Sequence, residues 1–209
     1  MQQEKYGVRS AWATVAFLMA GFAAPALAHH PMGGAAPSTA LQGLLSGLGH
    51  PVIEFDHLAF LICLGLLTSL VDQGRRRLIF PFVAVSLIGT FLHASGVTLP
   101  LPEMWVGLSL LLVAGLLLRA MKVSTGVAVG FCLFAGLAHG YAFGEAVIGV
   151  RTSALVSYLA GLFVVQSTML WLIAKGVQRV VPDLRRKVLV ASGASSAFLG
   201  VYALAGGAF

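Results

Sequence analysis

Long apolar segments alternate with short polar stretches along almost the whole chain. A membrane-spanning helix needs about 20 apolar residues, and most of the segments that follow a Gly/Ala/Ser/Pro-rich linker at 33–39 reach that length. The pattern therefore predicts an all-α polytopic membrane bundle with six spans over 41–209. The segments cover roughly 41–71, 78–96, 103–121, 125–148, 153–175 and 187–207.

The first segment is too long for one straight span and contains a proline. Pro51 has no backbone N–H, so it cannot complete the hydrogen-bond pattern of a helix. We therefore expect a kink or break at His50-Pro51. On that basis 41–49 forms a short amphipathic or half-inserted piece, and 52–71 forms the span proper.

The first 28 residues have the pattern of a secretory signal peptide. Lys5 and Arg9 precede an apolar run at 11–24, and Ala26-Leu27-Ala28 supplies the small residues of a cleavage site. The run is too short to span a bilayer comfortably, and the alternative is an uncleaved first transmembrane helix. Cleavage after Ala28 makes 29–40 a periplasmic segment that begins with two histidines.

Composition agrees with a membrane protein and excludes two other classes. Hydrophobic residues make up 58% of the 209 residues and charged residues 10%, whereas soluble domains are about 45–50% apolar and about 25% charged. A soluble protein this poor in charge could not cover its surface. Disordered chains are excluded because they combine low hydrophobicity with high charge.

The basic residues gather on one set of predicted loops. Ten of them flank the first, third and fifth spans on one side, whereas the opposite loops hold only Arg151. Basic loops of membrane proteins face the cytoplasm, so the N- and C-termini are predicted to be periplasmic. The net charge of +6 then requires no nucleic-acid partner. The ten residues are Arg75, Arg76, Arg77, Arg119, Lys122, Lys175, Arg179, Arg185, Arg186 and Lys187.

Motifs of catalytic and nucleotide-binding domains are absent from the sequence. There is no Walker A motif, no dinucleotide fingerprint and no H-E-x-x-H pair. We therefore predict that the chain is not an enzyme and that no ATPase within it powers transport. Cys63 and Cys132 lie in apolar runs without C-x-x-C spacing, and we interpret them as packing residues.

A small set of ionisable residues remains once the loops and the signal peptide are set aside. Such groups are costly in hydrocarbon, at about 2.5–3.5 kcal/mol for a central Asp, and are retained where they line a path or bind a ligand. A single histidine also serves as hydrogen-bonded glue between helices. Because all six histidines belong to this set, we favour a metal site. The candidate ligands are His29, His30, His50, Glu54, Asp56, His57, His93, His139 and Glu145.

The first group of candidates lies at 50–57. His50 and His57 are seven residues apart, so an unbroken helix would place them on one face. Asp56 is either a ligand or an acceptor for the ring N–H of a ligating histidine. Imidazole nitrogen combined with carboxylate oxygen suits Ni²⁺, Co²⁺ and Zn²⁺ better than Ca²⁺ or Mg²⁺.

The second group lies on the fourth span. Gly136, Gly140 and Gly144 recur every four residues, which predicts a smooth stripe that packs closely against another helix. Gly126 and Gly130 extend the small-residue spacing in the same span. We expect His139 to lie near this helix contact. Glu145 and His93 are predicted at periplasmic ends of spans. Glu145 is either an entry-side ligand or a snorkelling carboxylate.

Three stretches together resemble the HupE/UreJ family of small bacterial membrane proteins associated with hydrogenase and urease gene clusters. They are HHPMGG at 29–34, SGLGHPVI with DH at 46–57, and HGYA with GE at 139–145. The resemblance covers essentially the whole mature chain, and the HP…DH motif is its most specific part. It implies a nickel or cobalt permease of the bacterial inner membrane. The family's metal-handling residues carry over to His29, His50, Asp56, His57, His139 and Glu145.

The sequence departs from the family pattern at two positions. Glu54 stands where the family usually has glycine, which adds a carboxylate to the first group. Phe143 stands where the family often has a second histidine or a tyrosine, which removes one ligand. We expect the Glu54 carboxylate to replace part of the ligation that is lost because position 143 holds phenylalanine.

These observations favour a secondary permease for uptake of Ni²⁺ or Co²⁺. Two charges that move inward down about 100 mV gain about 4.6 kcal/mol, at about 2.3 kcal/mol per charge. The expected partners are the transported ion and the lipid bilayer, with no permanently bound cofactor. Assembly into a homo-oligomer or a larger membrane complex is also possible from the sequence. The alternatives are a membrane metalloenzyme, or a non-transporting subunit or accessory protein that assists assembly of a metalloenzyme or larger complex.

Overall fold

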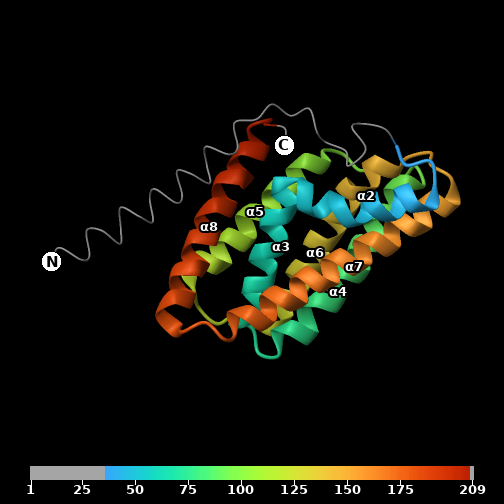
Figure 1. Ribbon diagram of the computed structural model, residues 1–209. Coiled ribbons are helices and arrows are strands. Elements are labelled where there is room, and N and C mark those ends of the chain that lie inside the picture. The colour runs from blue at the N-terminus through green and yellow to red at the C-terminus, as the bar shows by residue number, and fades with distance from the viewer. Residues whose placement is uncertain (1–35, 208–209) are drawn as a thin grey trace, which may run out of the picture.

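The computed structural model describes residues 36–207, and all regular structure in that range is helical (Figure 1). The predicted signal peptide at 1–28, together with His29 and His30, lies outside the described residues. The elements are α2 (Ala40–Ile53), α3 (Phe55–Leu67), η2 (Thr68–Leu70), α4 (Gly74–Ala94), α5 (Pro102–Arg119), α6 (Thr125–Gly144), η3 (Glu145–Val147), α7 (Thr152–Val177) and α8 (Pro182–Leu204).

Five of these helices are long and apolar enough to cross a membrane, and the bent pair α2–α3 brings the number to six when it is counted as one span. The all-α multi-pass membrane fold is thus confirmed. Local sequence sets several helix starts. Thr39 and Ser124 cap α2 and α6 by accepting backbone N–H bonds. Proline occupies the first turn of α5 and α8, where its missing N–H costs nothing; α8 therefore begins at Pro182, five residues before the predicted 187.

The break in the first span lies at Glu54, so the predicted break at His50-Pro51 is wrong. Helix α2 continues through Pro51 to Ile53, and Glu54 then adopts an extended conformation (φ −83°, ψ 118°). The axes of α2 and α3 differ by 75° across this residue. Glu54 closes α2 by donating its N–H to the carbonyl of His50, and its own carbonyl accepts the first hydrogen bond of α3. The predicted pieces 41–49 and 52–71 are accordingly 40–53 and 55–70.

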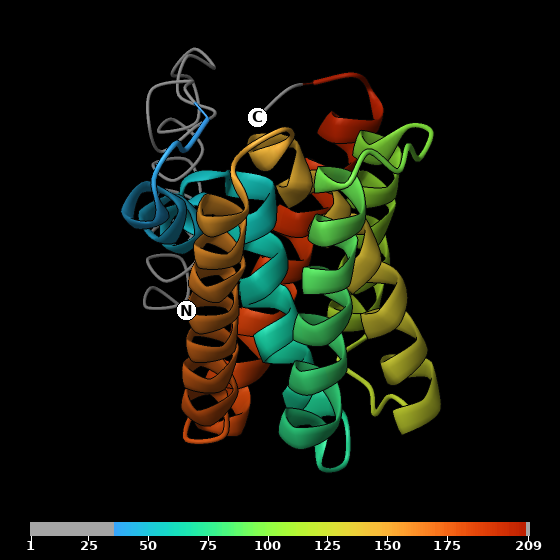
Figure 2. The ribbon, with the colours of Figure 1, turned by 90° about the vertical axis from the view of Figure 1, so that its right-hand side faces the viewer.

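Helix α3 lies in the middle of the bundle, with the other long helices around it (Figures 1 and 2). Its side chains Phe60, Leu61, Leu64 and Leu67 are at most 1% exposed. A helix that is apolar around most of its circumference forms the centre of a core rather than a lipid-facing wall. At the start of α3, Asp56 and His57 are buried, whereas Phe55 is 44% exposed.

The predicted glycine stripe on α6 packs against α4, as expected. A Cβ atom at Gly136 would lie 2.8 Å from the carbonyl oxygen of Phe82, and one at Gly140 would overlap the carbonyl of Ser86. Thr90 on α4 also donates a hydrogen bond to the carbonyl of Gly140 at 2.8 Å.

The stripe does not extend to Gly126 and Gly130, where a Cβ atom would meet nothing within 4 Å. Gly130 and Gly136 are six residues apart, so at 3.6 residues per turn Gly126 and Gly130 lie on a different face of α6 from the stripe, and both are exposed whereas Ala128 and Cys132 are buried.

Two further helix pairs use the same close packing. A Cβ at Gly43 or Gly47 of α2 would overlap the backbone of α7, and a Cβ added to Gly161 of α7 would lie 2.5 Å from the carbonyl oxygen of Leu44. Gly200 of α8 approaches the backbone of α5. Small residues let backbones approach closely in membrane bundles, and here they hold α2 beside α7 although α2 is too short to span alone.

The basic loops meet at one end of the bundle, the lower end in Figure 2. Lys122, between α5 and α6, bonds to Asp72, between η2 and α4, at 2.9 Å. The Lys122 ammonium lowers the pKa of the Asp72 carboxyl below its ordinary value. Both side chains are largely exposed, so this pair contributes little to stability. Cys63 and Cys132 are free thiols within the apolar core, as predicted.

Candidate metal centre

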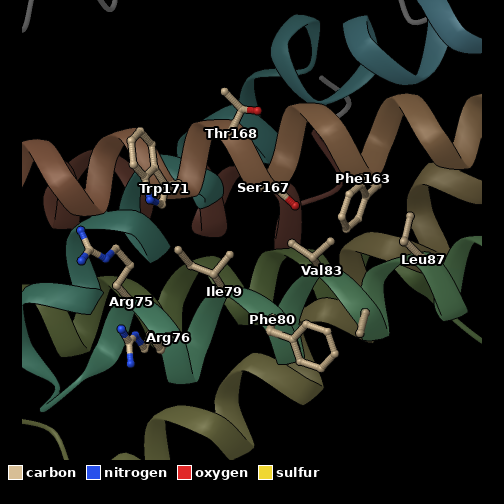
Figure 3. A pocket seen from close by; sticks show the side chains of 11 residues that line it. Arg75, Arg76, Ile79, Phe80, Val83, Leu87, Phe163, Ser167, Thr168 and Trp171 are labelled. Carbon is tan, nitrogen blue, oxygen red and sulfur yellow. The ribbon is translucent and has the colours of Figure 1, made fainter.

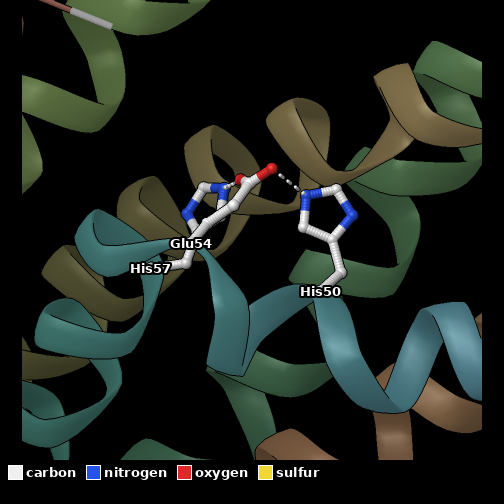
Figure 4. A group of neighbouring side chains, drawn as sticks. All are labelled: His50, Glu54 and His57. Atoms are coloured by element: carbon white, nitrogen blue, oxygen red, sulfur yellow. Dashed lines mark ion pairs between the residues drawn. The ribbon is translucent and has the colours of Figure 1, made fainter. Parts of the chain in front are cut away.

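A carboxylate bridges two histidines at the break of the first span (Figure 4). One oxygen of Glu54 lies 2.9 Å from Nε2 of His50, and the other lies 3.1 Å from Nε2 of His57. The side chains of the two histidines are 4% and 3% exposed, and that of Glu54 is 18% exposed. The three residues have the i, i+4, i+7 spacing of one helix face, and the 75° bend between α2 and α3 leaves both imidazoles on the one carboxylate.

A third histidine extends this group toward α5. Nδ1 of His57 lies 2.7 Å from Nδ1 of His139 on α6, so one of these two nitrogens donates and the other accepts. Nε2 of His139 lies 2.8 Å from the hydroxyl of Ser109 on α5. His139 is 1% exposed and Ser109 is 0% exposed.

The other end of the group reaches α7. The hydroxyl of Tyr158 lies 2.7 Å from Nδ1 of His50 and donates to the carbonyl of Phe143 at 2.8 Å. Tyr158 is fully buried. We call the resulting series of contacts the polar chain: Tyr158, His50, Glu54, His57, His139 and Ser109. It joins α7, α2, α3, α6 and α5 through side chains that lie among apolar residues.

Three members of the polar chain lie close to the geometry that a metal site requires. One ligand atom each of His50, Glu54 and His57 can be chosen so that all lie within 4.8 Å of one another. With metal–ligand bonds of about 2.0–2.2 Å, two ligands lie at most about 4.4 Å apart, so small side-chain movements suffice. Two imidazole nitrogens and a carboxylate oxygen form a donor set suited to Ni²⁺, Co²⁺ or Zn²⁺.

Asp56 lies beside the polar chain rather than within it. One carboxylate oxygen accepts the backbone N–H of His57 at 2.7 Å, and the other lies 3.9 Å from Nδ1 of the same histidine. The carboxylate is 5% exposed. Of the two roles left open by the sequence, this contact is nearer to positioning than to ligation, although the bond goes to the backbone and not to the ring.

Phe143, one of the two departures from the family pattern, lies against both bridged histidines. Its ring centroid is 4.2 Å from that of His57 and 5.2 Å from that of His50. The other departure, Glu54, contacts the same two rings. The two unusual residues are therefore neighbours of one pair of imidazoles, which is the arrangement that compensation requires.

Two candidate ligands lie apart from the polar chain. Nδ1 of His93 bonds to the carbonyl of Tyr141 at 2.6 Å, and the two rings stack at 3.9 Å with an interplanar angle of 7°. Glu145 begins η3 and is exposed.

The sequence interpretation missed the hydroxyls of Tyr158 and Ser109, and also Gln166. Gln166 bonds to Ser86 at 3.0 Å, and its side-chain oxygen has no hydrogen-bond partner in the described part of the chain. A search for buried uncharged polar residues within the spans would have found all three.

The family described as HupE / UreJ protein matches this chain over residues 17–203. Protein HupE of Rhizobium leguminosarum bv. viciae is 34% identical over 128 residues. That match covers 58% of this chain and 64% of the relative, which is less than two thirds of its length. No solved structure matches this chain.

Proposed function

The chain belongs to the HupE / UreJ family, and on that premise we propose that it is a secondary transporter that takes up Ni²⁺ or Co²⁺ across the bacterial inner membrane. The observation that carries the proposal is the bridge from His50 through Glu54 to His57 at the broken span. Broken helices in transporters commonly line the binding sites of substrates and coupling ions. Glu54 supplies negative charge, and the imidazoles supply nitrogen ligands for a transition metal.

The composition of the site favours exchange over permanent binding. A closed four-ligand site holds its ion as part of the structure, whereas a site with fewer protein ligands keeps positions open. His50, Glu54 and His57 supply three ligand atoms, and both imidazoles lie within bonding distance of the Glu54 carboxylate. The ion therefore replaces hydrogen bonds on entry, and these bonds form again when it leaves.

The location of the site supports uptake rather than export. The break at Glu54 lies at the end of the bundle opposite the basic loops, which we assign to the cytoplasm by the positive-inside rule. The polar chain then faces the periplasmic side, and the N- and C-termini are periplasmic. A membrane potential of about 100 mV, negative inside, supplies about 4.6 kcal/mol for the inward movement of a divalent ion, so uptake requires no ATPase.

Uptake of radioactive nickel and cobalt into proteoliposomes of the purified protein, with an imposed inside-negative potential, tests the proposal. Wild type is expected to accumulate one of the two ions, and His57→Ala is expected to reduce the initial rate at least about tenfold. His93→Ala is the matched control because His93 lies outside the polar chain, and it should stay within about twofold of wild type.

The same experiment separates transport from the accessory role. Protein that binds nickel or cobalt in calorimetry but gives no uptake at any imposed potential would support a non-transporting metallo-accessory protein. Protein that neither binds nor transports either ion would support a structural subunit. Equal uptake by His57→Ala and wild type, at equal amounts of folded protein, would exclude the polar chain as the transport site.

A further inference from the structure

A second feature, which shares no residue with the polar chain, lies on the outer surface between α4 and α7. There the two helices enclose an open groove of about 1050 Å³ (Figure 3). Its walls carry large apolar side chains that are well exposed, with Phe80 at 76%, Phe163 at 52% and Trp171 at 45%. Arg75 and Arg76 lie together at one end, next to Trp171 (Figure 3).

The length and direction of the groove match one leaflet of a bilayer. It extends along α4 from Arg75 to Leu87, and at 1.5 Å per residue this is about 18 Å. Half of a hydrocarbon core of about 30 Å is about 15 Å. The arginines lie at the end of the bundle where the basic loops gather, so the apolar part of the groove extends inward from headgroup depth. Trp171 lies at the same end, as tryptophans do at membrane interfaces.

Within residues 36–207, no carboxylate pairs with the charged end of the groove. Among the described residues the ion pairs involve Glu54, Asp56 and Asp72, and none reaches Arg75 or Arg76. The carboxylate nearest in sequence, Asp72, bonds to Lys122 instead. The side chains of Ser167 and Thr168 add hydroxyl groups on the α7 wall. Two unpaired guanidinium groups above an apolar groove fit a ligand with an anionic head and apolar tails.

We propose that this groove binds an anionic phospholipid, with the headgroup phosphate on Arg75 and Arg76 and an acyl chain along Ile79, Val83 and Phe163. Guanidinium groups bind phosphate oxygens through two parallel hydrogen bonds. Basic pockets between transmembrane helices on the cytoplasmic side are suited to anionic headgroups. The proposal is independent of the transported ion, because the groove shares no residue with the polar chain.

Native mass spectrometry of the full chain in detergent tests this assignment with phosphatidylglycerol and phosphatidylcholine of equal chain length. Wild type is expected to retain phosphatidylglycerol at least about tenfold more strongly. The double variant Arg75→Gln/Arg76→Gln is expected to lose that preference. Arg185→Gln/Arg186→Gln is the matched control, because it removes the same charge from α8 at the same end of the bundle and should retain the preference.

Two further measurements separate the lipid from other occupants. Ser167→Trp fills the groove and leaves both arginines, so it should also reduce lipid retention about tenfold. Glycerol phosphate, which has a headgroup without tails, should not displace the lipid. The proposal would be overturned if both arginine double variants lost the lipid alike, or if wild type retained the two lipids equally. It would also be overturned if glycerol phosphate displaced the lipid, or if the protein were a dimer that Ser167→Trp dissociates.

Discussion

Two histidine-containing regions lie at the same end of the bundle and differ in what their imidazoles contact. In the polar chain, His50 and His57 share the carboxylate of Glu54, and His57 also contacts His139. In the second region, His93 bonds to a backbone carbonyl and stacks on the ring of Tyr141. The first region gathers several imidazoles around one carboxylate, whereas in the second region one histidine bonds to the backbone within a packed helix pair.

The difference follows from the helices that carry each region. The polar chain forms where the first span is broken, so residues from two differently directed helices meet. His93 lies on the unbroken helix α4, where Gly144 of α6 brings the two backbones together. A histidine within a span therefore indicates function only when its surroundings include a charge partner and more ligands. The contrast predicts large effects on metal binding in the first region and effects on stability in the second.

Glu54→Gln is expected to have the largest effect. The amide keeps the size of the side chain but removes the charge and leaves a single acceptor oxygen for two imidazoles. Nickel or cobalt affinity in isothermal titration calorimetry should fall about 100-fold, because charged ligands dominate binding where little water competes. The melting temperature should change little.

Glu145→Gln provides the matched control for that measurement. It neutralises an exposed carboxylate at the same end of the bundle that lies outside the polar chain. Its metal affinity should stay within about twofold of wild type. If both substitutions weakened binding equally, general surface charge would be responsible and the distinction between the two regions would fail.

Gly144→Ala tests the packing role of the second region. The added Cβ would lie 2.5 Å from the Cβ of His93 and 2.8 Å from the carbonyl oxygen of Thr90. Overpacking of this kind costs about 1–3 kcal/mol, which should appear as a lower melting temperature in detergent. Gly130→Ala adds the same methyl group to the same helix in open space, and it should be neutral or stabilise by up to about 1 kcal/mol.

The helical membrane fold was predictable because hydrophobic length and loop charge are local properties. The glycine contacts on α6 were predictable in part, since Gly136, Gly140 and Gly144 share one face, whereas Gly126 and Gly130 lie on another face of the same helix. The break at Glu54 was not predictable, because Pro51 alone predicts a break three residues earlier in the chain. A proline costs one hydrogen bond, and the packing of α2 against α7 through Gly43 and Gly47 extends the helix past it.

The candidate site was predictable as a list of residue types but not as a set of contacts. The sequence places His50, Asp56, His57 and His139 among the candidates, and the structure brings the three histidines together. The sequence does not reveal that Asp56 accepts a backbone N–H bond while Glu54 bridges His50 and His57. The direction of a side chain after a 75° bend depends on tertiary packing, which no single-sequence pattern encodes.

The third prediction concerns compensation between the two departures from the family pattern. Glu54→Gly alone should abolish the bridge between His50 and His57 and weaken metal affinity about 100-fold. Adding Phe143→His places an imidazole where a ring already lies 4.2 Å from His57, and it should recover about tenfold. Affinity in the double variant no higher than in Glu54→Gly, with both proteins folded, would show that position 143 does not face the ion.

Tyr141→Phe is expected to have the smallest effect. The Tyr141 hydroxyl donates to the carbonyl of Val97 at 2.9 Å and accepts the N–H of Leu99 at 2.7 Å, so it fastens the α4–α5 connection to α6. Hydrogen bonds contribute about 0.5–1.5 kcal/mol each in water and about 0.6 kcal/mol on average between membrane helices. Removing the hydroxyl should therefore destabilise the protein by about 1 kcal/mol, measured as a melting shift, with metal affinity unchanged within about twofold. Because Tyr141 is only two residues from His139, a loss of affinity as large as that of Glu54→Gln would mean that this connection and the polar chain act as one unit.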